Sequence, residues 1–206
     1  MSRTLHGLYV ITDRHLMGDD LMSKAEQAIA GGARLLQYRD KSSDTKRQER
    51  EAIALALCCK QHKVNFIIND DPALALKAGA DGVHLGQNDG DISTIRQSLG
   101  RNKIIGVTCH SSLKKALVAE QAGADYVAFG RFFPSQTKPE APAAEIDILL
   151  QARDQLSIPI VAIGGITHKN GAELIASGAD MLAVIHGIFG TGDVRAATRQ
   201  YVELFG

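Results

Sequence analysis

Charged side chains of both signs follow several of the apolar runs in this sequence. Arg39 and Lys41 follow one run, Asp70 and Asp89 follow two later ones, and Lys138 lies in the longest irregular stretch. In proteins Mg²⁺ usually takes only one or two carboxylates and fills its remaining positions with phosphate oxygens and water. Cationic side chains bind phosphate oxygens as well. These residue types therefore favour a site for a magnesium-bound diphosphate.

A second group of residues suits a phosphate monoester. Gly164 and Gly165 follow a later apolar run, and Gly187 lies beside the last one. Backbone N–H groups of glycine turns bind phosphate well, and barrel enzymes often place such a site after their seventh and eighth strands. A glycine pair also lets a strand turn tightly into a helix, so this signal alone leaves both interpretations open.

The elements that position these residues form a regular series. Eight short, β-branched apolar runs alternate with amphipathic segments rich in Ala and Leu. Continuous apolar runs are typical of parallel strands that are covered on both faces. The runs are LYVITD (8–13), LLQYRD (35–40), NFIIND (65–70), GVHLG (82–86), IIGVTC (104–109), YVAFG (126–130), IPIVAIGG (158–165) and MLAVIHG (181–187).

Four of the amphipathic segments end in Gly-Ala immediately before an apolar run, in GGARLL, AGADGV, AGADYV and SGADML. Glycine suits the left-handed end of a helix, so each joint predicts that a helix ends and a strand begins. Eight such units in 206 residues predict a (β/α)8 TIM barrel. Residues 1–206 are expected to form a single domain of that fold. A doubly wound open sheet gives the same alternation and is the alternative.

In such barrels the chemistry lies at the C-terminal ends of the strands. Polar residues follow the predicted strands at that end, and Gln37 and Arg39, two positions apart, should point to the same side. Thr108 ends the fifth predicted strand, and Ile185 and His186 are expected within the eighth. Asp71 stands before Pro72 and is expected to cap the following helix instead.

Composition narrows the class of protein further. Lys and Arg number 23, as do Asp and Glu, so no strong field attracts nucleic acid or an anionic membrane. Three cysteines without a CxxC pair argue against a disulfide framework, and no apolar stretch approaches the roughly 20 residues that span a bilayer. The seven histidines show no zinc-binding spacing. We expect a cytoplasmic enzyme; the sequence leaves its oligomeric state open.

Seven motifs, in order and spread over nearly the whole chain, resemble the thiamine phosphate synthase family. They are QYRDK (37–41), NDD (69–71), GVHLGQND (82–89), GVTCH (106–110), PSQTK (134–138), IGGI (163–166) and VIHGI (184–188). Each motif alone is modest, and their combination is highly specific. The resemblance implies an enzyme whose partners are small phosphorylated molecules. It would join a hydroxymethylpyrimidine diphosphate to a thiazole phosphate, giving thiamine phosphate and pyrophosphate.

The resemblance also implies a role for each matching residue. Residues that would bind the pyrimidine diphosphate are Gln37, Arg39, Lys41, Asn69, Thr108 and Lys138, with Arg39, Lys41 and Lys138 acting in catalysis. Asp70 and Asp89 would bind Mg²⁺. Residues that would line the thiazole phosphate site are Ser135, Thr137, Gly165, Ile185 and His186. Three positions depart from the family pattern: Thr108 stands where the family has Ser, Ser135 where it has Thr, and His186 where it has Ser. Only His186 lacks the hydroxyl group.

No residue in these motifs is placed as an attacking nucleophile. An electron-rich aminopyrimidine can stabilise a cation at its exocyclic methylene, so the bond to diphosphate can ionise before the thiazole nitrogen attacks. Two alternatives remain at this stage. A related thiazole tautomerase would use a general base such as His110 in place of the cation cluster. A non-catalytic barrel could bind phosphorylated ligands and regulate a partner.

Overall fold

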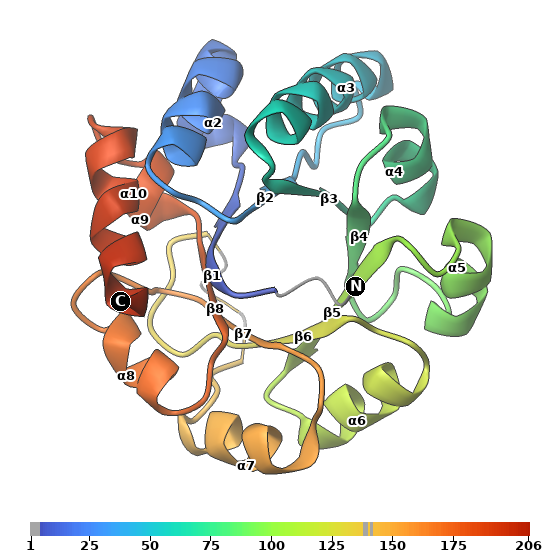
Figure 1. The fold of residues 1–206 in the computed structure, drawn as a ribbon, viewed down its shortest axis with the longest axis vertical. Coiled ribbons are helices and arrows are strands. Elements are labelled where there is room, and N and C mark those ends of the chain that lie inside the picture. The colour runs from blue at the N-terminus through green and yellow to red at the C-terminus, as the bar shows by residue number, and fades with distance from the viewer. Residues whose placement is uncertain (1–4, 138–139, 141) are drawn as a thin grey trace.

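The computed structural model describes residues 5–137, 140 and 142–206 and shows a closed barrel of eight parallel strands (Figure 1). The strands are β1 (Gly7–Ile11), β2 (Leu35–Tyr38), β3 (Asn65–Asn69), β4 (Gly82–Leu85), β5 (Ile104–His110), β6 (Tyr126–Phe129), β7 (Ile160–Ile163) and β8 (Met181–Val184). The barrel closes where β1 pairs with β8, Gly7 opposite Met181. The predicted (β/α)8 barrel is confirmed, and the open sheet is excluded.

Helices form a ring around the strands (Figure 1). They are α1 (Arg14–Met17), η1 (Gly18–Asp20), α2 (Leu21–Ala30), α3 (Thr45–His62), α4 (Pro72–Ala78), α5 (Ile92–Leu99), α6 (Leu113–Gln121), α7 (Asp147–Gln155), α8 (Gly171–Ala176), α9 (His186–Phe189), α10 (Val194–Val202) and η2 (Glu203–Phe205). Asp71 caps α4 as predicted, because its side chain accepts a hydrogen bond from the Leu74 N–H at 2.9 Å.

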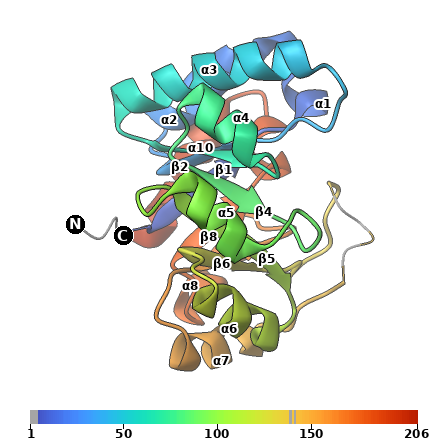
Figure 2. The same ribbon diagram turned by 90° about the vertical axis from the view of Figure 1, so that its right-hand side faces the viewer.

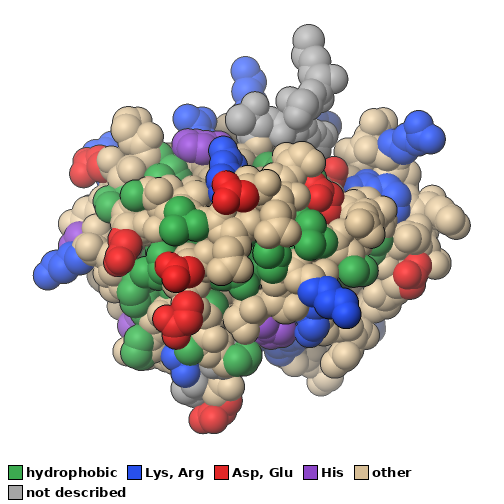
Figure 3. Space-filling view, turned by 90° about the horizontal axis from the view of Figure 1, so that it is seen from below, with side chains coloured by type: hydrophobic (Ala, Val, Ile, Leu, Met, Phe, Trp, Pro, Cys, Tyr) green, Lys and Arg blue, Asp and Glu red, His purple; other side chains and the backbone are tan. Residues whose placement is uncertain are grey.

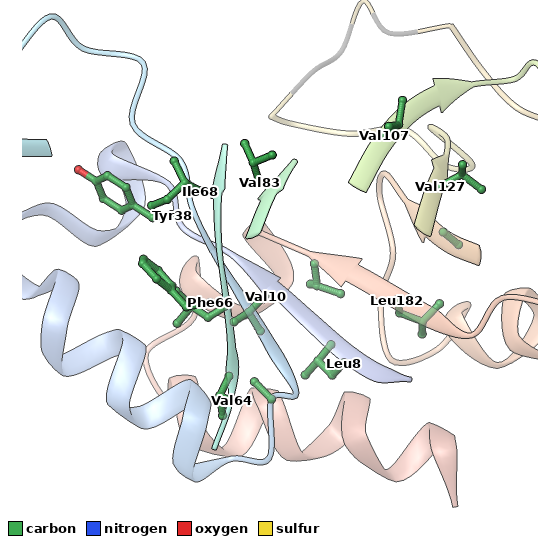
Figure 4. Packing of buried hydrophobic residues seen from close by; sticks show 14 of the residues in the cluster. Leu8, Val10, Tyr38, Val64, Phe66, Ile68, Val83, Val107, Val127 and Leu182 are labelled. Carbon is green, nitrogen blue, oxygen red and sulfur yellow. The ribbon is translucent and has the colours of Figure 1, made fainter. Parts of the chain in front are cut away.

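The strands alternate their side chains between two cores. Outward residues such as Val10, Phe66 and Val83 pack against the helices (Figure 4). Inward residues such as Tyr9, Ile67 and Met181 fill the barrel itself. Because parallel strands are buried on both faces, their sequences contain apolar residues at consecutive positions. Polar residues at inward positions are therefore unusual, and they mark where the barrel opens into a site.

Each predicted Gly-Ala joint has the same geometry. Gly32, Gly79, Gly123 and Gly178 all have positive φ, between 71° and 112°. The N–H of the alanine that follows each of them bonds to the carbonyl five residues earlier, at 2.9 to 3.2 Å. This is the helix ending that glycine favours. The joints thus end α2, α4, α6 and α8 at the face where the strands begin.

The two ends of the barrel differ. In Figure 2 the segment between β6 and α7 projects from the end where the strands finish, and the C-terminus lies at the opposite end. Over the face in Figure 3, acidic and basic side chains are interspersed with apolar ones. In the part of the chain that the structure describes, no helix is both long and apolar enough to cross a membrane.

Candidate active site

A cavity of about 460 Å³ opens at the C-terminal ends of the strands. Residues from every one of the eight strand ends line it. The cavity brings together all the predicted site residues that the structure describes, namely Gln37, Arg39, Lys41, Asn69, Asp70, Asp89, Thr108, Ser135, Thr137, Gly165, Ile185 and His186. Lys138 lies outside the described residues.

The end of β2 sends alternate residues in opposite directions. Gln37 is inward and only 2% exposed, and Arg39 lines the cavity two residues later. Tyr38 points outward and donates a hydrogen bond to Glu51 of α3 at 2.7 Å. Arg47 of α3 binds Asp40 at 2.9 Å. Burial opposes ionisation of Asp40, but the hydrogen bonds from Arg47 and Ser42 and the charge of Arg47 together outweigh it and lower the pKa of this carboxyl. These outward contacts hold the segment that presents the inward cation.

The Arg39 guanidinium is available for a ligand. Its backbone is fixed, because the Arg39 N–H donates to the Thr12 hydroxyl at 2.9 Å. Within residues 5–137, 140 and 142–206 its side chain makes no ion pair or hydrogen bond. A fixed, unpaired guanidinium can bind a phosphate group with two parallel hydrogen bonds.

Asp70 and Asp89 interact electrostatically at the ends of β3 and β4. Lys41 forms an ion pair with Asp70, and Asp89 accepts the Gly86 N–H at 2.6 Å. Burial opposes ionisation of Asp70, yet hydrogen bonds from Lys41 and Asp89 lower its pKa overall. Burial and the nearby Asp70 carboxylate raise the pKa of Asp89. The charge of Asp89 is therefore the unfavourable one of the pair, and a cation bound between the two carboxylates would stabilise it.

The donor set fits one kind of metal better than others. Among the described residues no three His, Cys, Asp or Glu side chains converge on one point. This excludes a fully protein-ligated centre within the described part of the chain. Asp70 and Asp89, in a cavity that Arg39 also lines, fit Mg²⁺, whose other ligands are water and substrate phosphate oxygens.

The loop after β7 lines the cavity and contains the glycine pair Gly164-Gly165. The carbonyl oxygens of Ile163, Gly164, Gly165 and Ile166 each accept a hydrogen bond from elsewhere in the protein, at 3.1 to 3.3 Å. Residues 164–166 line the cavity. Backbone N–H groups of such a glycine turn can form a cradle for an anion, and we refer to residues 163–166 as the cradle.

Phe133 and Pro134, which follow β6, pack against this loop at Gly165. A Cβ atom at Gly165 would overlap the Pro134 carbonyl, and the φ of Gly165 is +65°, so only glycine fits here without strain. The close approach brings Ser135 and Thr137, which also line the cavity, to the same side. The sequence motifs predicted this grouping, although they lie about 30 residues apart.

The expectation that His186 belongs to the eighth strand is wrong. β8 ends at Val184, and Ile185 (φ −118°, ψ −82°) turns the chain into α9, which His186 begins. The turn is needed because Gly187 packs directly against the Tyr201 hydroxyl, where a Cβ atom would overlap it. The His186 side chain is exposed at the edge of the cavity.

Some cavity residues were not predicted from the sequence. His84 of β4 and Arg131 after β6 line the cavity as well, together with Gln87, whose motif was expected at this end without a role of its own. His84 Nε2 lies 2.8 Å from the Thr108 hydroxyl. Its position two residues after Gly82 in β4 puts it on the inward face. This alternation is the signal that could have identified it.

A closed (β/α)8 barrel with a cation, paired carboxylates and a glycine turn around one cavity has the features of a barrel enzyme that acts on small molecules. Residues 8–188 match the family model for thiamine monophosphate synthase, and the chain belongs to that family. It is 52% identical to a thiamine-phosphate synthase of Thioalkalivibrio sulfidiphilus, over 98% of this chain and 96% of that one. A thiamine-phosphate synthase of Nitrosococcus oceani is 50% identical, over 100% of this chain and 95% of that one.

A solved structure supports the same grouping. Thiamine phosphate pyrophosphorylase from Pyrococcus furiosus superimposes with a TM-score of 0.89 at 34% identity, covering 98% of this chain and 96% of that one.

Proposed function

We propose that this protein is a Mg²⁺-dependent thiamine phosphate synthase. It transfers the pyrimidine-methyl group of 4-amino-5-hydroxymethyl-2-methylpyrimidine diphosphate to the nitrogen of 4-methyl-5-(2-phosphooxyethyl)thiazole. The products are thiamine phosphate and pyrophosphate. The resemblance to synthases over the full chain supports this activity.

One observation about the site carries the proposal. Two groups of residues, each suited to bind an anion, line a single cavity. The cations and carboxylates come from β2, β3 and the segment after β4, whereas the cradle and the residues packed against it follow β7 and β6. In a barrel of eight strands in chain order, these sets lie on opposite sides. A cavity with two opposed anion sites suits an enzyme that joins two phosphorylated substrates.

The reaction needs charge stabilisation and alignment. The C–O bond to the diphosphate breaks with its electron pair passing to the diphosphate oxygen, and the thiazole nitrogen lone pair then forms the new C–N bond. Arg39, Lys41 and Lys138 stabilise the negative charge that develops on the leaving group. The cradle around Gly165, with Ser135 and Thr137, anchors the thiazole phosphate and so aligns the nitrogen.

Asp70 and Asp89 would hold the metal ion. When bound, Mg²⁺ neutralises charge on the diphosphate oxygens. Gln37, Asn69 and Thr108 would bind the pyrimidine ring beneath the diphosphate, since they line the cavity at inward positions.

The surroundings of the enzyme are also part of the proposal. We expect it to act in the cytoplasm on small molecules and to bind no nucleic acid. Its three cysteines are all buried and unpaired, which suits a reducing compartment. The equal numbers of acidic and basic residues offer no basic surface for nucleic acid.

A pyrophosphate-release assay tests the function. Release is expected only when both substrates and Mg²⁺ are present, and EDTA should abolish it. Conversion between thiazole tautomers without pyrophosphate release would point to a tautomerase. Binding of both ligands without any turnover would point to a non-catalytic barrel.

A further inference from the structure

A chain of hydrogen bonds crosses the interior of the barrel beneath the cavity. Gln37 Nε2 of β2 donates to the Tyr9 hydroxyl of β1 at 2.6 Å. The Tyr9 hydroxyl lies 2.8 Å from the Tyr126 hydroxyl of β6, and the two rings meet edge to face at 5.9 Å. All three side chains are almost fully buried.

The chain continues to the other side of the cavity floor. The Tyr126 hydroxyl lies 3.0 Å from His84 Nδ1, and the rings stack at 5.6 Å. His84 Nε2 in turn lies 2.8 Å from the Thr108 hydroxyl of β5. Gln37 and Thr108, which both line the cavity, are therefore the two ends of one chain.

Counting hydrogens gives the chain a direction. Burial raises the pKa of both Tyr9 and Tyr126, so each phenol keeps its single hydrogen. With Tyr9 accepting from Gln37, every hydrogen of the chain has an acceptor when Tyr9 donates to Tyr126 and Tyr126 donates to His84 Nδ1. In this arrangement a neutral imidazole carries its hydrogen on Nε2 and donates to Thr108. The Thr108 hydroxyl keeps its own hydrogen for a ligand.

We infer that Tyr9 and Tyr126 are positioning residues that fix the orientation of the Gln37 amide. Because the Gln37 NH₂ group is held by Tyr9, its carbonyl oxygen faces the cavity. That oxygen accepts a hydrogen bond from an exocyclic amino group but repels the carbonyl of an oxo-pyrimidine. The tyrosine pair thereby sets the preference for an aminopyrimidine. This inference rests on the proposed function, in which Gln37 contacts the pyrimidine ring.

The packing of β5 supports a dedicated place for the Tyr126 ring. Gly106 is the register partner of Tyr126 on the neighbouring strand. A Cβ atom at Gly106 would overlap the Tyr126 ring and its hydroxyl. Gly106 and Thr108 belong to the same inward face of β5, so one short motif supplies both the space for the ring and one end of the chain.

The decisive variant is Tyr126→Phe, which removes the middle hydroxyl and keeps the ring. The Tyr9 hydrogen then has no acceptor except Gln37, so the amide should turn its carbonyl to Tyr9 and its NH₂ group to the cavity. We expect the ratio of kcat/KM for the aminopyrimidine diphosphate over its 4-oxo analogue to fall at least about tenfold. Tyr9→Phe, which frees the amide altogether, should lower the ratio as well. It also provides a second variant if Tyr126→Phe does not fold.

Tyr201→Phe is the matched control. It also removes a buried tyrosine hydroxyl, one that donates to the Ile166 carbonyl at 3.1 Å and lies outside the chain. It should leave the amino-to-oxo ratio unchanged, whatever it does to stability.

¹⁵N NMR of the ligand-free protein gives a readout that needs no turnover. His84, assigned with a His84→Asn variant, should show a protonated Nε2 and an acceptor Nδ1 in the wild type. In Tyr126→Phe the Nδ1 resonance should move to the position of a nitrogen without a hydrogen-bond donor. An unchanged amino-to-oxo ratio, or a wild-type His84 protonated on Nδ1, would overturn the inference. A failure of the proposed function would instead appear as absent turnover in the wild type, with the His84 tautomer still as inferred.

Discussion

Replacing Asp89 with asparagine should make the metal-free protein more stable while weakening its affinity for Mg²⁺. Burial and the neighbouring Asp70 carboxylate both raise the pKa of Asp89, so its charge is unfavourable in the fold without a cation. Asparagine removes that charge and can still accept the Gly86 N–H, which Asp89 accepts at 2.6 Å. The same substitution removes one of the two carboxylates proposed to bind the metal.

The size of the effect follows from the setting of the pair. Two unit charges about 4 Å apart interact by roughly 1 kcal/mol in water and more strongly at lower dielectric. Asp89 is partly exposed, and Lys41, paired with Asp70, offsets part of the repulsion. We therefore expect a gain of about 1 kcal/mol or less in the free energy of unfolding. In a domain of this size that corresponds to a rise in Tm of roughly 2–4 °C at most.

Thermal unfolding in EDTA and in excess Mg²⁺ measures both effects. Mg²⁺ should raise the Tm of the wild type, because a ligand that binds the folded state stabilises it, and should raise that of Asp89→Asn much less. Asp91→Asn is the matched control. Asp91 accepts the Thr94 N–H at 2.7 Å as the cap of α5, and this bond lowers its pKa. Its charge is thus favourable, and its removal should not raise the Tm in EDTA. A lower Tm for Asp89→Asn in EDTA, or equal stabilisation of variant and wild type by Mg²⁺, would refute the reasoning.

Four further predictions concern other parts of the molecule. Lys138→Ala should lower kcat about 10²-fold with a smaller change in KM. Arg39→Ala should also raise KM for the pyrimidine diphosphate, because the Arg39 guanidinium lines the cavity before the diphosphate bond ionises. Steady-state kinetics on both variants measure these constants. Gly165→Ala should raise KM for the thiazole phosphate at least about tenfold and leave KM for the pyrimidine diphosphate unchanged, since the added Cβ would overlap the β6–α7 segment. Burial raises the pKa of Cys109 to about 12, so this thiol should resist a disulfide reagent at pH 8 until urea unfolds the protein. Asp125→Ala should cost about 1–3 kcal/mol in urea unfolding without changing kcat, because its carboxylate accepts a β5 backbone N–H at 2.7 Å at the end of the barrel away from the cavity.

The sequence predicted most of the fold because its signals are local. Continuous apolar runs and Gly-Ala joints each report a single element, and all eight predicted strands are present. The predicted site residues that the structure describes also line one cavity. In a parallel barrel every strand finishes at the same end, so polar residues such as Arg39 and Asp70 must meet there.

The residues that sequence reasoning missed depend on contacts across the barrel. Tyr9 and Tyr126 lie within apolar runs and look like ordinary core residues in the sequence. Nothing near either of them in the sequence shows that their hydroxyls form a hydrogen bond. His84 likewise bonds to residues from β5 and β6, which follow later in the chain. His186 was placed in the wrong element because the apolar pattern of β8 continues into α9, and only the packing of Gly187 ends the strand.

The four Gly-Ala joints have a consequence for how this barrel is assembled. They precede β2, β4, β6 and β8, so three similar βαβα units lie between successive joints, and β1 and β8 belong to shorter pieces at the two ends of the chain. An aspartate follows three of the four joints, and its carboxylate accepts a hydrogen bond from a backbone N–H of the strand before that joint. Asp81 accepts from β3, Asp125 from β5 and Asp180 from β7. The end of the barrel where the strands begin is thus periodic, as expected of a chain built by repeated duplication of one unit. The opposite end of the barrel differs from unit to unit, because the segments after the strands supply separate parts of the cavity. A circular permutant opened between a strand and the helix that follows it would cut only this irregular end and leave the repeated joints intact.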